Sequence, residues 1–139
     1  MTISQISVFI ENKPGRLTEI IKVLSANGID IRALSIADTT DFGILRIIAS
    51  EPERAVQVLR AEGVTVSKTE VIGVLFDDKT GALLDVLEIL NKENIAVEYA
   101  YAFITHSKTE ASVILRVEDN AKAIKVLSDA GVSLVEGIK

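Results

Sequence analysis

The stretch ISVFIENKPGRLTEIIKVLSANGIDI, residues 6–31, decides the fold of this chain. Apolar residues alternate from Ile6 to Ile10, which is the period-two pattern of a strand with one buried face. The turn-forming segment 11–15, ENKPG, interrupts that pattern. Apolar residues then recur at i, i+3, i+4 and i+7, which predicts a helix over 15–26, and Gly28 is placed to end it. The stretch therefore predicts a strand, a hinge, a helix and the entry to a second strand.

The same pattern returns 66 positions later as IGVLFDDKTGALLDVLEILNKENIAV, residues 72–97. Lys13 corresponds to Lys79 in this alignment, and Gly15 corresponds to Gly81. A chain that repeats its pattern in this way is interpreted as two copies of one structural unit. We expect the first copy to span 1–69 and the second 70–139.

The remainder of each copy predicts two more strands, a second helix and a short fourth strand. In the first copy Gly63 is placed to end the second helix. The resulting order, β-α-β-β-α-β, predicts an antiparallel sheet with both helices on one face. We expect an α+β protein of two ferredoxin-like repeats, whose sheets join side by side into eight strands. The ranges expected after the first helix are strands 29–37 and 42–50 and fourth strand 64–66 in the first copy, and strand 71–76, helix 81–92 and strands 95–104 and 110–117 in the second.

Composition limits the classes of function. The 139 residues carry 15 basic and 20 acidic side chains, a net charge of −5, which argues against a nucleic-acid groove. The absence of cysteine excludes disulfides and thiolate sites, and the single histidine, His106, can form neither a histidine cluster for a metal nor a catalytic triad. No apolar run reaches the roughly 20 residues of a membrane helix, and no signal peptide is visible. We expect a cytoplasmic protein without a cofactor.

The face of the sheet opposite the helices is expected to be unusually apolar. In the first copy it would carry Phe9, Ile44 and Ile48, and in the second Leu75. A solvated face seldom gathers such residues. We therefore expect a partner to cover it, most simply a second copy of the chain in a homodimer.

The motif ENKPGRL at Glu11–Leu17, followed by GIDI at Gly28–Ile31, resembles the hinge of the ACT domain, a ligand-sensing module of amino-acid metabolism. It is particularly similar to the regulatory domain of phosphoglycerate dehydrogenase, which binds serine. The resemblance covers the whole chain as two tandem repeats, as in stand-alone tandem ACT proteins that bind amino acids. It implies a β-α-β-β-α-β fold and a regulatory role without catalysis.

The resemblance also implies where a ligand binds. In the dehydrogenase domain the contacts come from a histidine, from the hinge asparagine two residues later and from an asparagine after the helix. The corresponding residues here are Ile10, Asn12 and Asp30, so only the hinge asparagine is retained. In the second copy these positions hold Phe76, Asp78 and Ala96, and the two copies need not bind alike.

An amino acid presents a carboxylate, an ammonium group and a side chain. Backbone N–H groups at the start of each helix suit the carboxylate, and glycine there allows close approach. Carboxylate or amide side chains suit the ammonium group, and the candidates are Asn12, Asp30, Asp77 and Asp78. The alternative is that Asn12, Asp77 and Asp78 only form turns or cap the helices. The full set of candidate ligand-binding residues is Ile10, Asn12, Pro14, Gly15, Arg16, Leu17, Asp30, Phe76, Asp77, Asp78, Gly81 and Ala82.

The leading hypothesis is a non-catalytic sensor that binds a free amino acid at the hinge and at the interface between the two repeats. The first alternative is a regulatory or scaffold subunit that modulates a partner enzyme without a ligand. An RNA-binding module of the same topology is disfavoured, because Phe42–Arg46 lacks the paired aromatic residues and the charge is acidic. A small ferredoxin-like enzyme is disfavoured because no nucleophile and base are clustered in the sequence.

Overall fold

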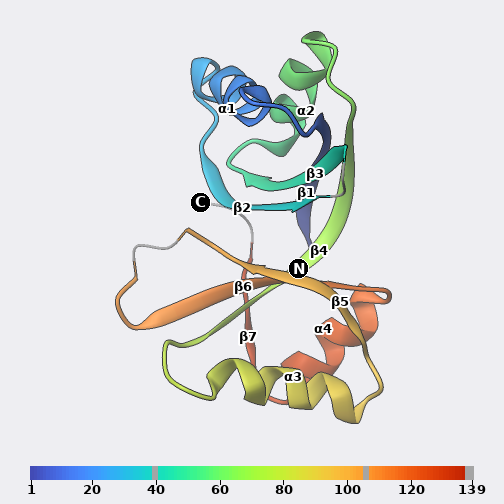
Figure 1. Cartoon of the computed structure of the whole chain (residues 1–139). Coiled ribbons are helices and arrows are strands. Elements are labelled where there is room, and N and C mark those ends of the chain that lie inside the picture. The colour runs from blue at the N-terminus through green and yellow to red at the C-terminus, as the bar shows by residue number, and fades with distance from the viewer. Residues whose placement is uncertain (39–40, 105–106, 137–139) are drawn as a thin grey trace. The chain divides into compact units, whose positions relative to one another are not determined.

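The computed structural model describes residues 1–38, 41–104 and 107–136. It divides into two compact units, shown in Figure 1. Among the described residues, the N-terminal unit is Ser4–Thr69, and the C-terminal unit combines Met1–Ile3 with residues 70–136. The tips of the two expected hairpin turns, and His106 with them, lie outside the described residues.

The N-terminal unit contains antiparallel strands in the order β2-β3-β1, with both helices on the same side of them (Figure 1). Phe9 of β1 donates a backbone hydrogen bond to Thr65, the residue before β4, over 3.1 Å, so the segment leading into β4 lies beside β1. The elements are β1 (Ile3–Glu11), α1 (Arg16–Ala26), β2 (Ile31–Asp38), β3 (Phe42–Ala49), α2 (Pro52–Ala61) and the start of β4 (Val66–Asp77).

The C-terminal unit repeats this arrangement, with β4 in the place of β1 and the order β7-β4-β6-β5. The register of β5 on β6 shifts between Val97 and Tyr99, as that of β2 on β3 shifts between Ile31 and Ala33, at equivalent positions of the repeat. The remaining elements are α3 (Ala82–Lys92), β5 (Val97–Ala102), β6 (Glu110–Val117), α4 (Asn120–Asp129) and β7 (Ser133–Leu134).

Strand β4 runs through the join between the two copies. Two separate strands were predicted, at 64–66 and 71–76, but the structure has one continuous strand of 12 residues, Val66–Asp77. The intervening segment 67–70, SKTE, contains neither glycine nor proline, so nothing in it interrupts an extended backbone. The described residues consequently form seven strands instead of eight.

Each unit has its own apolar core between its helices and one face of its strands. In the N-terminal unit Leu24 of α1 and Leu59 of α2 are fully buried against strand residues such as Leu45. In the C-terminal unit Leu90 and Leu127 occupy the corresponding places. The two ferredoxin-like folds expected from the sequence are thus confirmed. Among the described residues no helix is long and apolar enough to cross a bilayer.

The helix-free face of the N-terminal unit is less uniform than expected. Phe9 is 53% exposed and the neighbouring Phe42 is 57% exposed, whereas Ile44 is half-buried and Ile48 is fully buried. The apolar residues open to solvent on this face are therefore mainly the two phenylalanines.

Candidate functional site

The two hinges have nearly the same backbone. We call Glu11–Gly15 the first hinge and Asp77–Gly81 the second hinge. In the first, the N–H of Asn12 donates to the carbonyl of Asp41 over 2.9 Å, and in the second, the N–H of Asp78 donates to Thr109 over 2.8 Å. Each hinge also has a tight turn. The N–H of Lys13 donates to the carbonyl of Glu11 over 2.9 Å, and the N–H of Lys79 donates to the carbonyl of Asp77 over 2.8 Å.

Glycine is required at the end of both hinges. Gly15 has φ of 87° and Gly81 has φ of 90°, in the left-handed region that side chains disfavour. Both glycines are the N-cap residues of their helices, and no side chain caps either helix. The suggestion that Asn12, Asp77 or Asp78 is a helix cap is therefore wrong. Asn12 and Asp78 lie in the bends that follow β1 and β4, whereas Asp77 is the last residue of β4. The helix starts favour negative charge through their dipoles.

Ion pairs cross the first hinge. Lys13 Nζ lies 2.8 Å from a carboxylate oxygen of Glu11. The guanidinium of Arg16 lies 3.8 Å from Glu11 and 3.0 Å from Glu19, one turn further along α1. The ammonium group of Lys13 and, to a lesser degree, the guanidinium of Arg16 hold the pKa of Glu11 below its usual value. The carboxylates of Glu11 and Glu19, at the first hinge and the start of α1, are thus paired with cations of the same segment.

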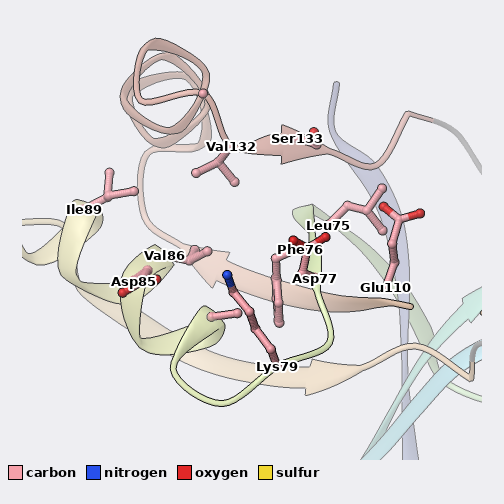
Figure 2. A pocket seen from close by; sticks show the side chains of 12 residues that line it. Leu75, Phe76, Asp77, Lys79, Asp85, Val86, Ile89, Glu110, Val132 and Ser133 are labelled. Carbon is pink, nitrogen blue, oxygen red and sulfur yellow. The ribbon is translucent and has the colours of Figure 1, made fainter. Parts of the chain in front are cut away.

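A cavity of about 320 Å³ opens at the second hinge. Figure 2 shows the side chains that line it. This volume is at the lower end of the range for small-molecule pockets. The end of β4, the first two turns of α3, the start of β6 and the connection from α4 to β7 form its walls. Its lining residues are Leu75, Phe76, Asp77, Lys79, Ala82, Asp85, Val86, Ile89, Glu110, Gly131, Val132 and Ser133.

The walls of this cavity combine an apolar surface with charged groups. Phe76, Val86, Ile89 and Val132 supply the apolar part. The charged groups are three carboxylates, from Asp77, Asp85 and Glu110, and the ammonium group of Lys79. Among the residues that the structure describes, none of these four side chains forms an ion pair. The charges are therefore available to a ligand.

Ala82 removes one source of pairing for Asp77 and Asp85. It occupies the position of Arg16, 66 residues earlier, whose guanidinium pairs with two carboxylates. The carboxylates Asp77 and Asp85 correspond to Glu11 and Glu19, and each is one methylene shorter. A methyl group thus replaces the long cation, and shorter acids flank the space.

The structure distributes the predicted site residues over different environments. Phe76, Asp77 and Ala82 line the cavity, whereas Asp78 is exposed in the turn beside it. In the N-terminal unit Ile10 and Leu17 pack against the apolar core, while Asn12 and Pro14 are exposed in the first hinge. The helix expected over 15–26 begins at Arg16, and Pro14 precedes it in the first hinge.

Asp30 lies at the far end of α1 from the first hinge. With a rise of 1.5 Å per residue, the 11 residues of α1 separate the two by roughly 16 Å. There Asp30 pairs with Arg32, and its backbone N–H donates to the hydroxyl of Ser50 over 2.9 Å. It borders a separate hollow with Ile21 and other residues of that helix end. Within the N-terminal unit, Asp30 and Asn12 do not meet.

Several lining residues were missed in the sequence. Lys79 was recognised as a repeated residue but not as a site residue, although it belongs to the hinge. Asp85 could have been found, because it lies one helical turn after Gly81 and faces the same side as Ala82. Glu110 becomes visible only from the strand register, which pairs it with Asp77. Val132 lies in the connection from α4 to β7, directly before Ser133, which pairs with β4.

A metal ion is not indicated by the arrangement of the carboxylates. Among the described residues no three acidic, histidine or cysteine side chains lie close enough together to hold a metal. The cavity therefore presents separated charges around an apolar wall, which suits an organic ion with groups at several positions.

Comparison with known proteins identifies the fold. A family model described as an ACT domain pair matches residues 1–137. The crystal structure of protein BT0572 from Bacteroides thetaiotaomicron is 39% identical, covers 97% of this chain and 92% of that chain, and has a TM-score of 0.92. The regulatory subunit of aspartate kinase from Thermus thermophilus is 15% identical over 91% of both chains, with a TM-score of 0.66, which shows a shared fold. No curated protein matches the chain.

Proposed function

Because the chain belongs to the ACT domain pair family, whose domains are regulatory and not catalytic, we propose that it senses a free amino acid at the second hinge. The observation that supports this site is the cavity at the start of α3, with unpaired charges on its rim and an apolar wall. The family supplies the regulatory role, and the cavity supplies the chemistry of a ligand. The proposed site is contained within the C-terminal unit.

Each part of an amino acid has a complementary group in this cavity. The carboxylate suits the ammonium group of Lys79 and the uncapped start of α3. The ammonium group suits Asp77 or Glu110, which lie opposite each other on β4 and β6. The side chain would then lie against the apolar wall around Phe76 and Val86.

Binding there would connect segments that are distant in the sequence. The walls come from residues 75–89, from Glu110 and from residues 131–133. A ligand that contacts all of them stabilises the C-terminal unit relative to states in which these segments separate. Such a change in stability is the means by which we propose that a non-catalytic protein transmits the presence of a metabolite to a partner enzyme.

Thermal-shift measurements against the twenty amino acids test this function. One or two of them should raise the melting temperature, because a ligand at a hundred times its Kd stabilises by about 2.7 kcal/mol. Tm should rise further with ligand concentration. No shift with any of the twenty would contradict the sensor and favour the alternative, a regulatory or scaffold subunit that works without a ligand.

We also propose that the partner of the N-terminal unit is a second copy of the chain. β2 is the outer strand of its sheet, and its Leu34 and Ile36 are 38% and 45% exposed. Antiparallel pairing of β2 with itself about Ser35 would place Leu34 opposite Ile36 of the partner subunit, and the reverse. That self-complementarity is what a two-fold interface requires.

Light scattering after size exclusion tests the homodimer. The wild-type chain should have twice the mass of 15.0 kDa at high concentration. Ile36→Lys should shift it toward the monomer, because a charged residue on an outer strand opposes strand pairing. Gln57→Lys, on the exposed side of α2, adds the same charge elsewhere and should leave the mass unchanged. A wild-type monomer would refute this interface.

A further inference from the structure

The cavity at the second hinge carries an excess of negative charge. Its lining contains the three carboxylates of Asp77, Asp85 and Glu110 and one ammonium group, that of Lys79. An amino acid with an uncharged side chain has no net charge, so the local excess of two negative charges would remain when it binds. A ligand with one additional positive charge would reduce this excess to one.

The first hinge shows how two carboxylates at these repeat positions bind a cation. There the guanidinium of Arg16 lies between Glu11 and Glu19, at 3.8 and 3.0 Å. Glu11 and Glu19 occupy the repeat positions of Asp77 and Asp85, on the same hinge backbone. In the N-terminal unit, therefore, the counterparts of Asp77 and Asp85 bind a cation that belongs to the chain itself.

We infer that the ligand of the second hinge is a cationic amino acid, with a guanidinium or ammonium group on its side chain. This inference rests on the proposed function and specifies its ligand class. The side-chain cation takes the place that Arg16 takes in the first hinge, between Asp77 and Asp85. The carbon chain of the ligand lies against Phe76 and Val86, and its carboxylate pairs with Lys79.

The shapes of the two hinges support the same assignment. The change from Arg16 to Ala82 removes a long side chain, and Asp77 and Asp85 are each one methylene shorter than the glutamates. Both changes enlarge the space between the acids without changing their charge. The second hinge thus keeps the acidic pair while leaving its cation to be supplied from solution.

Titration calorimetry of the full chain with matched ligands tests the inference. The probes are arginine against citrulline, and lysine against norleucine, because each pair differs in the side-chain charge at similar size. At least one cation should bind about tenfold more tightly than its neutral partner, since two charge-assisted contacts with exposed carboxylates together contribute about 1.4 kcal/mol. The preference of the protein for the cationic ligand over the neutral one should decrease in high salt.

Two kinds of variant locate the effect. Asp85→Asn removes one carboxylate at an exposed position and should reduce the preference for the cation severalfold, while binding of the neutral partner changes little. Ala82→Arg restores the residue of the first hinge and should abolish binding of the cation. Leu84→Arg adds the same charge on the same turn of α3 outside the cavity lining, and should leave binding in place.

The outcomes separate this inference from the proposed function. Equal binding of charged and neutral partners, or tighter binding of the neutral one, would overturn the cationic ligand while leaving an amino-acid sensor. Failure of all twenty amino acids to bind would overturn both. If Ala82→Arg does not fold, the Asp85→Asn result decides, and an unchanged preference in that variant would refute the inference.

Discussion

The two hinges of this protein share a backbone but differ in what fills the space beside it. Each ends in a glycine with φ near 90° and begins a helix that no side chain caps. In the first hinge Arg16 and Lys13 neutralise Glu11. In the second hinge the corresponding acids border a cavity.

This difference shows how a duplicated domain can divide its tasks. The backbone hinge is needed by both copies, because it connects the strand to the helix in the same fold. The side chains on it are free to change, and under the inference drawn above the single difference between Arg16 and Ala82 would decide whether the cation is internal or supplied by a ligand. Fold and ligand site therefore depend on different atoms of the same segment.

The largest losses of stability should come from substitutions in the two cores, and equivalent substitutions should cost the same in each unit. Leu24→Ala and Leu90→Ala remove the same fully buried side chain from equivalent helices. Each should lower the free energy of unfolding by about 2–5 kcal/mol, from lost burial and the cavity left behind. Denaturant unfolding of both variants measures this. A loss below about 1 kcal/mol in one of them would show that the two cores are not equivalent.

The hinge glycines should be equally sensitive to substitution. A Cβ atom at Gly15 or Gly81 would meet no atom within 4 Å, so the cost comes from the backbone conformation alone. Gly15→Val and Gly81→Val should each cost about 2 kcal/mol, because a β-branched residue strongly disfavours positive φ. Denaturant unfolding again measures the loss. A clearly larger loss in one hinge would contradict their common backbone.

The topology could be predicted from the sequence because it depends on periodicity, on glycine positions and on the repeat. The alternation from Ile6 to Ile10 and the helical spacing after Leu17 are local signals, and both recur 66 residues later. The join between the copies was missed, because the absence of glycine and proline from 67–70 permits a continuous strand without requiring one.

The candidate site could be predicted only in part. Phe76, Asp77 and Ala82 belong to the hinge, so the motif pointed to them directly. Glu110 reaches the cavity through strand pairing, and Val132 reaches it from the connection that leads into β7. The alignment of the copies places Arg16 opposite Ala82, but only the structure shows that Arg16 pairs with Glu11 and Glu19.

A smaller effect is expected when the internal cation is removed from the first hinge. Arg16→Ala breaks the contacts of the guanidinium with Glu11 and Glu19, which are 44% and 65% exposed. Because exposed ion pairs contribute little, the loss of stability should be about 0.2–1 kcal/mol and should disappear in high salt. Chemical denaturation at two salt concentrations measures it. A salt-independent loss would point to a packing role for Arg16.

The smallest effect concerns the titration of Glu11. Lys13, and to a lesser degree Arg16, lowers the pKa of its carboxyl group. A carboxyl group with a lowered pKa in the folded state contributes stability above its unfolded pKa and loses it as the pH falls through the folded value. Lys13→Met should therefore raise the pKa of Glu11, as followed by NMR. An unchanged pKa would mean that Lys13 does not hold this carboxylate in solution.

The most direct test of the central claim is an NMR titration of the full chain with the amino acid that gives the largest thermal shift. The amide signals of Gly81, Ala82 and Asp85 should move with a common saturating dependence on ligand concentration. Those of their counterparts Gly15, Arg16 and Glu19 should remain in place. Shifts confined to the first hinge, or to neither hinge, would contradict a sensor whose ligand replaces the missing cation at Ala82.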